Sequence, residues 1–364
     1  MSGDNNSIPS MLGLCNPLLD ISAYVDDSIL KKYDLQPDNV ILAGENHKDL
    51  CKELVEKYPV EYTAGGSAQN VMRVAAGILK RQGVKSRVIF TGCIGQDEFG
   101  SLMSKKASED GVITNYSVTD TEPTGTCAVC LTDGGKNRSL CAFLGASQKF
   151  SDQHLKDNWK ELVATTDIIY MSGFLIAVSP DSFRLLGEHI ANCDNDKRRF
   201  CLNLSAPYVS AVFGKELEKV MKYVDILFGN DDEALAYAEH KDWNTTDIEL
   251  IGRKIALDEK ARKSVNRIVV ITRGGDPIVL VRQLSQDDVE IKKFPCKPIP
   301  REEIVDTNGA GDSFAGGFLS QFVQGYSLDH CVKVGDYAAR EIIKLSGIAV
   351  PDFAELPADG ICTN

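Results

Sequence analysis

The feature of the sequence that most constrains the fold is a regular alternation of strand-like and helix-like segments after about residue 160. Short apolar runs predict strands, and the segments between them space their apolar residues as helices do. The expected strands are 168–171, 200–204, 225–228 and 268–272, and the expected helices are 182–191, 215–223, 231–239 and 248–257. Such alternation is typical of parallel strands joined by crossover helices, so we expect an α/β protein with a mostly parallel central sheet.

Further elements extend this pattern toward both ends of the chain. Residues 11–25 predict a strand interrupted at Asn16-Pro17, and the run at 278–281 is typical of an antiparallel hairpin edge. The segment 283–303 is polar and punctuated by prolines, and we expect it to be exposed. We also expect a strand at 87–91 and helices at 45–57, after Gly65-Gly66-Ser67, at 312–324 and at 328–345.

The rhythm of the sequence changes between about residues 112 and 146. Short apolar runs there alternate with turn signals, and Asp133-Gly134-Gly135 is typical of a hairpin turn. We therefore expect a small antiparallel lid made of residues 12–25 and 112–146. Residues 26–111 and 147–364 are then expected to form the large α/β part of one protein that spans residues 1–364.

Charge and cysteine content exclude several classes of function. With a net charge of −12, the surface does not attract polyanions at long range, so we do not expect nucleic acid as a partner. No apolar stretch approaches the ~20 residues that cross a membrane, and the N-terminal residues carry no export signal. The eleven cysteines are an odd number and scattered, which does not suggest a disulfide framework. We expect a cytoplasmic monomer with no membrane partner, and we keep the nucleus as a second location.

The most informative short segment is Asp306-Thr307-Asn308-Gly309-Ala310-Gly311-Asp312, which leads into a predicted helix. Glycines at a helix start let a ligand approach the backbone, and the free N–H groups of the first turn bind anions. Asp312 would repel such an anion, unless it accepts a proton from a hydroxyl that attacks a phosphate. The alternative is an ordinary helix start, in which Asp312 caps the first turn and the glycines serve packing.

Two segments near the N-terminus also carry polar groups suited to a ligand. Asn16 and Asp20 end a predicted strand, and a carboxylate that accepts two neighbouring hydroxyl protons suits a ribose diol. Gly65-Gly66-Ser67-Ala68-Gln69-Asn70 is a glycine turn into a helix, which brings backbone N–H groups and Asn70 toward a polar ligand. The alternatives are a simple Asn-Pro turn with Asp20 as a polar strand end, and a helix with Ser67 as its N-cap.

Together these segments resemble the ribokinase family of sugar and nucleoside kinases. Residues 306–318 match the family's C-terminal signature, and the segments around Asn16 and Gly65 match its sugar-binding part. Within the family the chain most resembles the members that phosphorylate adenosine, and the matches run from about residue 12 to 350. The matching segments are Asn16–Ala23, Glu61–Asn70, Pro123–Cys127, Asn203–Pro207 and Val224–Asn230. This resemblance implies a ribokinase-like three-layer α/β/α fold with a small β-rich lid.

The resemblance also implies roles for individual residues. Asp312 is implied as the catalytic base, and Arg138 as a group that meets the transferring phosphate when the lid closes. The backbone of Gly309, Ala310 and Gly311 is implied as the anion hole. The implied ribose contacts are Asp20, Gly65, Gly66, Ser67 and Asn70. The implied base contacts are Asn16, Leu18, Val40, Leu42, Cys127, Leu140, Ala142, Leu144 and Phe174, with Tyr208 and Asn308 nearby. Most are apolar, as a flat purine requires, although plain core or lid packing is the alternative for each apolar member.

Two further matches concern the phosphoryl donor. Asn230-Asp231-Asp232-Glu233 matches the family's Asn-x-x-Glu element, so Asn230 and Glu233 are implied to hold Mg²⁺, largely through water. Thr272-Arg273-Gly274-Gly275 takes the place of the glycine turn that binds ATP, with Thr272, Arg273 and Gly274 as implied contacts. This turn departs from the family pattern, because the usual third glycine is absent and Pro277 stands close by. The alternatives are a capped acidic first turn at 231–233 and a surface role for Arg273.

Other chemistries lack their motifs. The chain has no P-loop sequence and no Gly-x-Gly-x-x-Gly opening its first βαβ unit, its Cys127–Cys130 spacing has no second pair, and its histidines show no metal spacing. The implied reaction transfers the γ-phosphate of ATP, with Mg²⁺, to the 5′-hydroxyl of adenosine and yields AMP and ADP, a purine-salvage step. One alternative is a ribokinase-family kinase for another nucleoside or a sugar. The other is an inactive nucleoside-binding regulatory protein.

Overall fold

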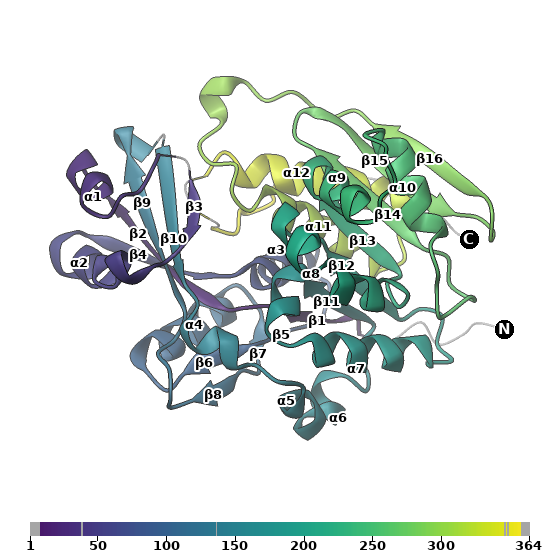
Figure 1. Ribbon diagram of the computed structural model, residues 1–364, viewed down its shortest axis with the longest axis horizontal. Helices are drawn as coiled ribbons and strands as arrows, with labels where there is room; N and C mark the ends of the chain where they lie inside the picture. Colours follow the sequence, from purple (N-terminus) through teal and green to yellow (C-terminus); the bar gives the residue numbers. More distant parts are fainter. Residues whose placement is uncertain (1–7, 38, 136, 346, 348, 358–364) are drawn as a thin grey trace.

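The computed structural model describes residues 8–37, 39–135, 137–345, 347 and 349–357, and a nine-stranded sheet forms its centre (Figure 1). The strand order is β16-β15-β14-β13-β12-β11-β1-β5-β7. All pairs from β7 to β14 are parallel, whereas β15 pairs antiparallel with both β14 and β16. The expected mostly parallel sheet is therefore confirmed. The bounds are β1 Ser10–Leu14, β5 Arg87–Thr91, β7 Ile113–Thr114, β11 Ile168–Ser172, β12 Arg199–Asn203, β13 Ile226–Asn230, β14 Ile268–Arg273, β15 Asp276–Gln283 and β16 Val289–Phe294.

Helices cover both faces of this sheet, because successive residues of each buried strand point to opposite sides. In β11, Ile169 and Met171 pack in one apolar cluster with α5 to α10, and Ile168 and Tyr170 pack in another with α3, α4, α11 and α12. The result is the expected three-layer α/β/α arrangement. The helices are α3 Ser67–Arg81, α4 Glu98–Glu109, α5 Asp152–Asp157, α6 Trp159–Leu162, α7 Pro180–Ala191, α8 Pro207–Met221, α9 Asp231–His240, α10 Ile248–Leu257, α11 Ala310–Phe322 and α12 Leu328–Ile342.

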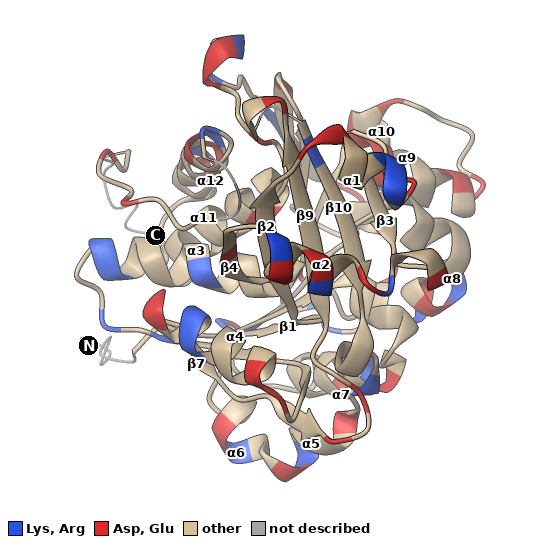
Figure 2. Ribbon diagram, turned by 90° about the vertical axis from the view of Figure 1, so that its left-hand side faces the viewer, with Lys and Arg blue, Asp and Glu red and all other residues tan. Residues whose placement is uncertain are grey.

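A smaller, five-stranded sheet lies to one side of the large one (Figure 1). Its order is β3-β10-β9-β2-β4, and helices α1 and α2 cover one of its faces through an apolar cluster. Figure 2 looks onto these helices, which carry both basic and acidic residues, and Lys57 of α2 forms an ion pair with Glu53 (2.9 Å). The bounds are β2 Leu18–Tyr24, α1 Asp27–Lys32, β3 Val40–Leu42, α2 Leu50–Lys57, β4 Val60–Gly65, β9 Thr126–Thr132 and β10 Asn137–Phe143.

The small sheet differs from the expected lid in its members and in its pairing. Residues 27–65 supply α1, β3, α2 and β4, although we expected 26–111 in the large part. Conversely, β1 and β7 belong to the large sheet, and β8 (Ser117–Thr119) pairs with β6 (Cys93–Gly95). The expected antiparallel pairing is also wrong in part, because β2 with β9 and β3 with β10 are parallel. These strands pair with partners distant in sequence, which a local pattern does not reveal.

The chain crosses between the two sheets four times, after β1, β4, β8 and β10. Glycines let these crossings pack backbone against backbone. A Cβ atom on Gly66, which has φ of +98°, would clash with the carbonyl oxygen of Asn16, and one on Gly125 would lie 2.6 Å from the carbonyl oxygen of Leu144. The four crossings therefore meet in one tightly packed region.

The C-terminal half corrects two smaller expectations. The run at 278–281 lies inside β15, which forms the expected antiparallel hairpin with β14 but is not the sheet edge, because β16 adds a further strand from within the segment 283–303. β16 contains three charged residues among six, and two of them, Lys292 and Lys293, break the alternation of apolar and charged residues, so the sequence pattern did not predict the strand. Helices α11 and α12 begin and end within three residues of the expected bounds.

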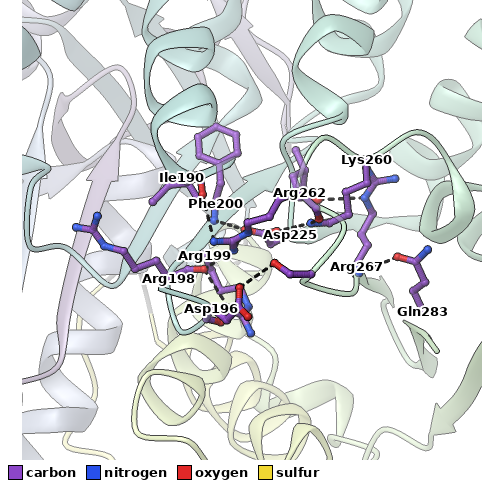
Figure 3. A network of polar contacts seen from close by, with 12 residues as sticks. Ile190, Asp196, Arg198, Arg199, Phe200, Asp225, Lys260, Arg262, Arg267 and Gln283 are labelled. Atoms are coloured by element: carbon purple, nitrogen blue, oxygen red, sulfur yellow. Dashed lines mark hydrogen bonds and ion pairs between the residues drawn. The ribbon is translucent and has the colours of Figure 1, made fainter. Parts of the chain in front are cut away.

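A network of buried cations holds the amino ends of β12, β13 and β14 (Figure 3). Asp225 accepts from Lys260 (2.6 Å) and from Arg262 (3.0 Å), and its neighbour across the sheet, Arg267, is 0% exposed. The Arg267 guanidinium donates to the carbonyl oxygens of five residues at the ends of helices and in nearby loops: Met221, Val224, Ile255, Asp258 and Glu259. Because a positive charge at a helix C-terminus is attracted to the negative end of the helix dipole, we infer that this network stabilises the amino edge of the sheet.

Two absences bear on the expected setting of the protein. Among the residues that can be described, no helix combines the length and apolar character needed to cross a bilayer. The described cysteines are all free thiols.

Candidate functional site

The predicted polar loops converge at the carboxyl edge of the large sheet. Because β1, β11, β12, β13 and β14 run parallel, the segments that follow them emerge on the same side. Asn16 follows β1, Phe174 follows β11, Asn230 ends β13, and Thr272, directly across from Asn230, lies in β14. This is the edge where open α/β sheets bind ligands.

Helix α11 begins at this edge with a glycine in a left-handed conformation. Gly309 is its N-cap residue, with φ of +76°, and no side chain caps the helix. Ala310 and Gly311 open the first turn, and a Cβ atom on Gly311 would meet no atom within 4 Å. The first-turn N–H groups are therefore approachable, which is what anion binding requires.

Asp312, in this first turn, is held by the helix that follows the other glycine turn. Ser67 Oγ donates to Asp312 Oδ1 (2.8 Å), and Asn70 Nδ2 donates to Oδ2 (3.0 Å). Loss of hydration raises the pKa of Asp312 to about 6, against the lowering effect of these two hydrogen bonds. The carboxylate thus bonds to α3 rather than capping its own helix, and the capping alternative for Asp312 is wrong. Ser67 is the first residue of α3 and Gly66 its N-cap, so the N-cap alternative for Ser67 is wrong as well.

The glycine turn at 65–66 packs directly on Asp20. A Cβ atom on Gly65 would lie 2.5 Å from Asp20 Oδ1, so only glycine leaves room for the carboxylate. Asp20 lies within β2, not at a strand end as expected, and is paired across from Thr63 and Cys127. Burial raises the pKa of Asp20 to about 6, although the nearby guanidinium groups lower it. The two predicted ribose segments are therefore in contact.

Two guanidinium groups, those of Arg138 and Arg73, lower the pKa of Asp20. No role for Arg73 was predicted from the sequence. Arg73 of α3 is buried, donates to the Ala64 carbonyl oxygen (2.6 Å), and forms an ion pair with Asp110 (2.6 Å). It fastens the strand that leads into the glycine turn. A signal for it was present in the sequence, since an arginine interrupts the apolar positions of an otherwise buried helix.

An apolar wall forms on the face of the small sheet opposite α1 and α2. Leu18, Leu140 and Ala142 pack there against the buried Cys127. On the edge strand β3, Val40 stands across from Leu140 and Leu42 across from Ala142. Val40 and Leu42 are 59% and 64% exposed, so the edge of the wall is apolar and open to a ligand.

The remaining predicted base contacts are Phe174, Tyr208, Asn16, Leu144 and Asn308. Phe174 lies in the 3-10 turn Gly173–Ala177 after β11 and Tyr208 in the first turn of α8 after β12, and their ring centroids lie 6.1 Å apart. Asn16 Nδ2 donates to the Ser147 carbonyl oxygen (3.2 Å), which fixes the amide. Leu144 follows β10 outside the apolar cluster of the wall, and Asn308 donates through both nitrogens to Asp306 Oδ1 (2.9 Å each).

Arg138 of β10 is bound to Asp306, the first residue of the signature segment. Its Nη1 lies 2.6 Å from Asp306 Oδ2, and the two side chains are 6% and 5% exposed. Asp306 thus joins the small sheet to the loop before α11 and also holds Asn308. Sequence reasoning placed Asp306 in the signature without a role, and its only signal was its position six residues before Asp312.

In the segment expected to bind the phosphoryl donor, Asn230 and Glu233 form hydrogen bonds with one another. Asn230 Oδ1 accepts from the Glu233 N–H (2.8 Å), and the Asn230 N–H and Nδ2 donate to the Glu233 carboxylate (3.0 and 3.1 Å). The capping alternative is therefore confirmed as a local description. Burial raises the pKa of Glu233 to about 7, and the negative charge of Asp312 adds to the shift. The negative charges of Glu233 and Asp312 therefore repel one another across the site.

The segment 272–275 forms the tight turn between β14 and β15. Gly274 has φ of +56°, and neither Gly274 nor Gly275 has an atom within 4 Å of a built Cβ position. Arg273 is partly exposed and lies 3.7 Å from Asp276. The turn is open to a ligand, and the surface alternative for Arg273 stays open too.

The oxygen atoms of Asn230 and Glu233 fit a metal ion that has few direct protein ligands. Across the described part of the chain, no three His, Cys, Asp or Glu side chains are grouped to hold a metal ion. Glu233 and Asn230 offer the oxygen atoms that Mg²⁺ prefers, but their mutual bonds leave them suited to contact through water.

Comparisons with known proteins show the family and the fold of the chain. A family model described as pfkB family carbohydrate kinase matches residues 32–352. Adenosine kinase 2 of Arabidopsis thaliana is 42% identical over 354 residues, covering 97% of this chain and 99% of the relative. The crystal structure of Anopheles gambiae adenosine kinase in complex with P1,P4-di(adenosine-5) tetraphosphate has a TM-score of 0.81 and 44% identity, covering 93% and 96% of the two chains. Adenosine kinase from Schistosoma mansoni in complex with adenosine, in an occluded loop conformation, has a TM-score of 0.82 and 31% identity, covering 95% and 98%.

Proposed function

The chain belongs to the pfkB family of carbohydrate kinases, and we propose that it is an adenosine kinase. It transfers the γ-phosphoryl group of ATP to the 5′-hydroxyl of adenosine and releases AMP and ADP. One observation carries the proposal: Asp312, beside the open first turn of α11, is bonded to Ser67 and Asn70 of the helix that begins at the glycine turn. A proton acceptor and an anion site are thereby joined to a pocket for a sugar.

The nucleoside is held between the two sheets in this proposal. The ribose hydroxyls meet the Asp20 carboxylate and the glycine turn, and the base lies against the apolar wall of the small sheet. The wall's Leu140 and Ala142, with the exposed Val40 and Leu42, support a flat apolar ligand over a simple sugar. The adenosine bound to the Schistosoma mansoni relative agrees with this choice.

Asp312 acts as general base in the chemical step. As the 5′-oxygen attacks the γ-phosphorus, its proton passes to the Asp312 carboxylate, a P–O bond to the nucleoside forms, and the bond to the leaving ADP oxygen breaks. A pKa of about 6 leaves the carboxylate ionised at neutral pH while making it a stronger base than an ordinary aspartate. The N–H groups of Gly309, Ala310 and Gly311 stabilise the negative charge on the phosphoryl oxygens.

ATP lies over the ends of β13 and β14 in this proposal. Thr272, Arg273 and Gly274 contact the nucleotide, and Asn230 and Glu233 hold Mg²⁺ through water. When bound, the magnesium ion neutralises phosphate charge. The proximity of Asn230 to Thr272, which are directly paired, supports a shared site.

Arg138 meets the transferring phosphoryl group after the small sheet moves as a lid. What supports this is its place on β10 and its ion pair with Asp306, at the loop that leads into the anion site. Hydrogen exchange tests the movement: with adenosine at saturation, amides of residues 126–143 or of Leu18–Tyr24 should gain protection. If neither segment changes, the small sheet does not close.

A panel of nucleosides and sugars tests the activity itself. We expect ATP-dependent phosphorylation of adenosine at a higher kcat/KM than of uridine, inosine or ribose. A preference for ribose would favour a sugar kinase, and adenosine binding without turnover would favour an inactive regulatory protein. The cytoplasmic or nuclear location and the monomeric state remain predictions that this panel does not address.

A further inference from the structure

Ser205, just after β12 at the carboxyl edge of the large sheet, has a left-handed backbone, with φ of +71°. Side chains other than glycine, asparagine and aspartate rarely adopt this conformation. The other described non-glycine residues with positive φ are Asp or Asn, apart from Phe353. A strained serine beside a ligand site is a reason to ask what its side chain does there.

The backbone and the side chain of Ser205 are both bonded to neighbours at this edge. The Ser205 N–H donates to Asn203 Oδ1 (2.9 Å), which stabilises the turn. Its hydroxyl oxygen accepts from the N–H of Gly173 (2.9 Å) and shares a hydrogen bond with the Ser172 hydroxyl (2.7 Å). The left-handed conformation thus aims one hydroxyl at the end of the adjacent strand, β11.

The residues that Ser205 contacts lead directly to the two aromatic rings of the candidate base site. Phe174 follows Gly173, in the short 3-10 turn Gly173–Ala177. On the other side, Ala206 is the N-cap of α8, whose second residue is Tyr208. Ser205 therefore links the turn that carries Phe174 to the segment that leads into α8 and Tyr208, and the centroids of the two rings are 6.1 Å apart.

The fit at Gly173 leaves little freedom for this link. A Cβ atom there would lie 2.9 Å from the carbonyl oxygens of both Asn203 and Leu204, so the two loops touch along their backbones. Without an acceptor on Ser205, the Gly173 N–H would lose its bond in this contact, and the turn that carries Phe174 would shift to recover one.

We propose that Ser205 is a positioning residue for base recognition: its hydroxyl holds the turn of Phe174 against the start of α8, which carries Tyr208, and so sets the aromatic side of the base site. This inference rests on the proposed function. It assigns Ser205 no part in phosphoryl transfer, because none of its bonds reaches Asp312 or the first turn of α11.

Two substitutions separate the hydroxyl from the backbone strain. Ser205→Ala removes the acceptor and keeps the strained backbone, whereas Ser205→Gly removes the acceptor and relieves the strain. We expect both to raise the KM for adenosine roughly tenfold, with kcat within about twofold, and to reduce the preference for adenosine over uridine. The glycine variant should unfold at the higher temperature of the two. Ser10→Ala is the matched control, since the buried Ser10 hydroxyl bonds to Asp167 (2.8 Å) at the opposite edge of the sheet.

A double variant tests whether Ser205 acts through Phe174. If it does, adding Ser205→Gly to Phe174→Ala should change the adenosine KM by less than about twofold, because the positioned ring is already absent. Full additivity, or a glycine variant with the wild-type KM and base preference, would overturn the inference. Should the alanine variant fail to fold, the glycine variant alone decides.

Wild-type controls distinguish failure of this inference from failure of the proposed function. If the wild-type protein neither binds adenosine in calorimetry nor phosphorylates it, both are rejected. If the wild type phosphorylates adenosine and the Ser205 variants match it, only the role of Ser205 is rejected.

Discussion

Arg138 on the small sheet and Asp306 before α11 form a buried ion pair, with Nη1 2.6 Å from Oδ2. The pair ties the two parts of the molecule together beside the anion site. It also occupies the arginine that the transferring phosphoryl group is proposed to need. An incoming phosphate and Asp306 therefore compete for, or share, one guanidinium group.

Replacing Arg138 should separate its effect on chemistry from its effect on binding. We expect Arg138→Ala to lower kcat at least tenfold while the dissociation constant for adenosine changes less than about threefold, since the arginine meets the phosphoryl group. Steady-state kinetics and calorimetry measure the two quantities. Arg282→Ala is the control, because Arg282 pairs with Glu290 at the surface (3.0 Å). An effect on affinity alone would move Arg138 into the nucleoside pocket.

Asp312→Asn should remove the proton acceptor and preserve the site around it. The asparagine retains the size of the side chain and one oxygen acceptor for Ser67 or Asn70, so adenosine should still bind. The turnover rate should fall by ~10²–10⁴-fold, the usual contribution of a general base. A matched control is Asp181→Asn, since Asp181 is also an aspartate in a helix first turn but is 67% exposed. Near-normal turnover of folded Asp312→Asn would remove Asp312 from this role.

The rate and the stability should respond to pH in opposite directions. Only ionised Asp312 accepts a proton, so kcat should fall as the pH drops through about 6, and this limb should vanish in Asp312→Asn. Because the folded-state pKa is raised from 3.8, the folded protein binds more protons than the unfolded chain between these values. The stabilising effect of that proton is complete below about pH 4 and is lost as the pH rises through about 6.

Thermal unfolding measures the second part of this prediction. Asp312→Asn should gain stability relative to the wild type as the pH is raised from about 4 to about 8, since only the wild type ionises there. A difference in unfolding temperature that stays constant over this range would show that the folded-state pKa of Asp312 is not raised.

Asp20→Ala tests the ribose contact. Removing a charged acceptor of hydroxyl hydrogen bonds should weaken adenosine binding by about 1.5–3 kcal/mol. The wild-type protein should bind 2′,3′-dideoxyadenosine less tightly than adenosine, and Asp20→Ala should bind the two almost equally. Equal binding of both nucleosides by the wild type would contradict the diol assignment.

The cation network at the opposite edge should govern stability and leave catalysis alone. Arg267→Met removes the buried guanidinium that donates to five backbone carbonyl oxygens, so we expect a loss of about 3–5 kcal/mol in the free energy of unfolding. In the folded fraction, kcat/KM for adenosine should stay within twofold of the wild type. A selective loss of activity without loss of stability would contradict this division between the two edges.

Much of the large sheet could be predicted from the sequence, because its signals are local. The strand at Arg87–Thr91 and helix α10 match their expected bounds, and both are short, strongly patterned segments. The segment 306–312 likewise predicted a helix that begins after glycine, and Gly309 is the N-cap residue of α11. The small sheet was harder, since the three-residue β3 carries no periodicity and its Val40 and Leu42 are exposed apolar residues.

The contacts inside the site mostly could not be read from the sequence. Asp312 was expected to stand beside an anion, but its bonds to Ser67 and Asn70 depend on how α3 and α11 pack. The pairing of Arg138 with Asp306 and the fit of Gly65 on Asp20 likewise join residues that only the fold brings together. The roles of these residues in catalysis and binding stay predictions until the variants are measured.

The four crossings between the sheets set the mechanics of the molecule. A part attached by one linker is free to swing in any direction, whereas four attachments packed backbone to backbone limit the proposed lid movement to rotation about the line of the crossings. In the proposed closure the small sheet therefore rocks about that line, because sliding or twisting would stretch a crossing. The end of the small sheet farthest from the crossings, where Thr132 of β9 pairs with Asn137 of β10, would therefore move farthest in the proposed closure, whereas Leu42, across from Ala142, lies near the crossings and would move least.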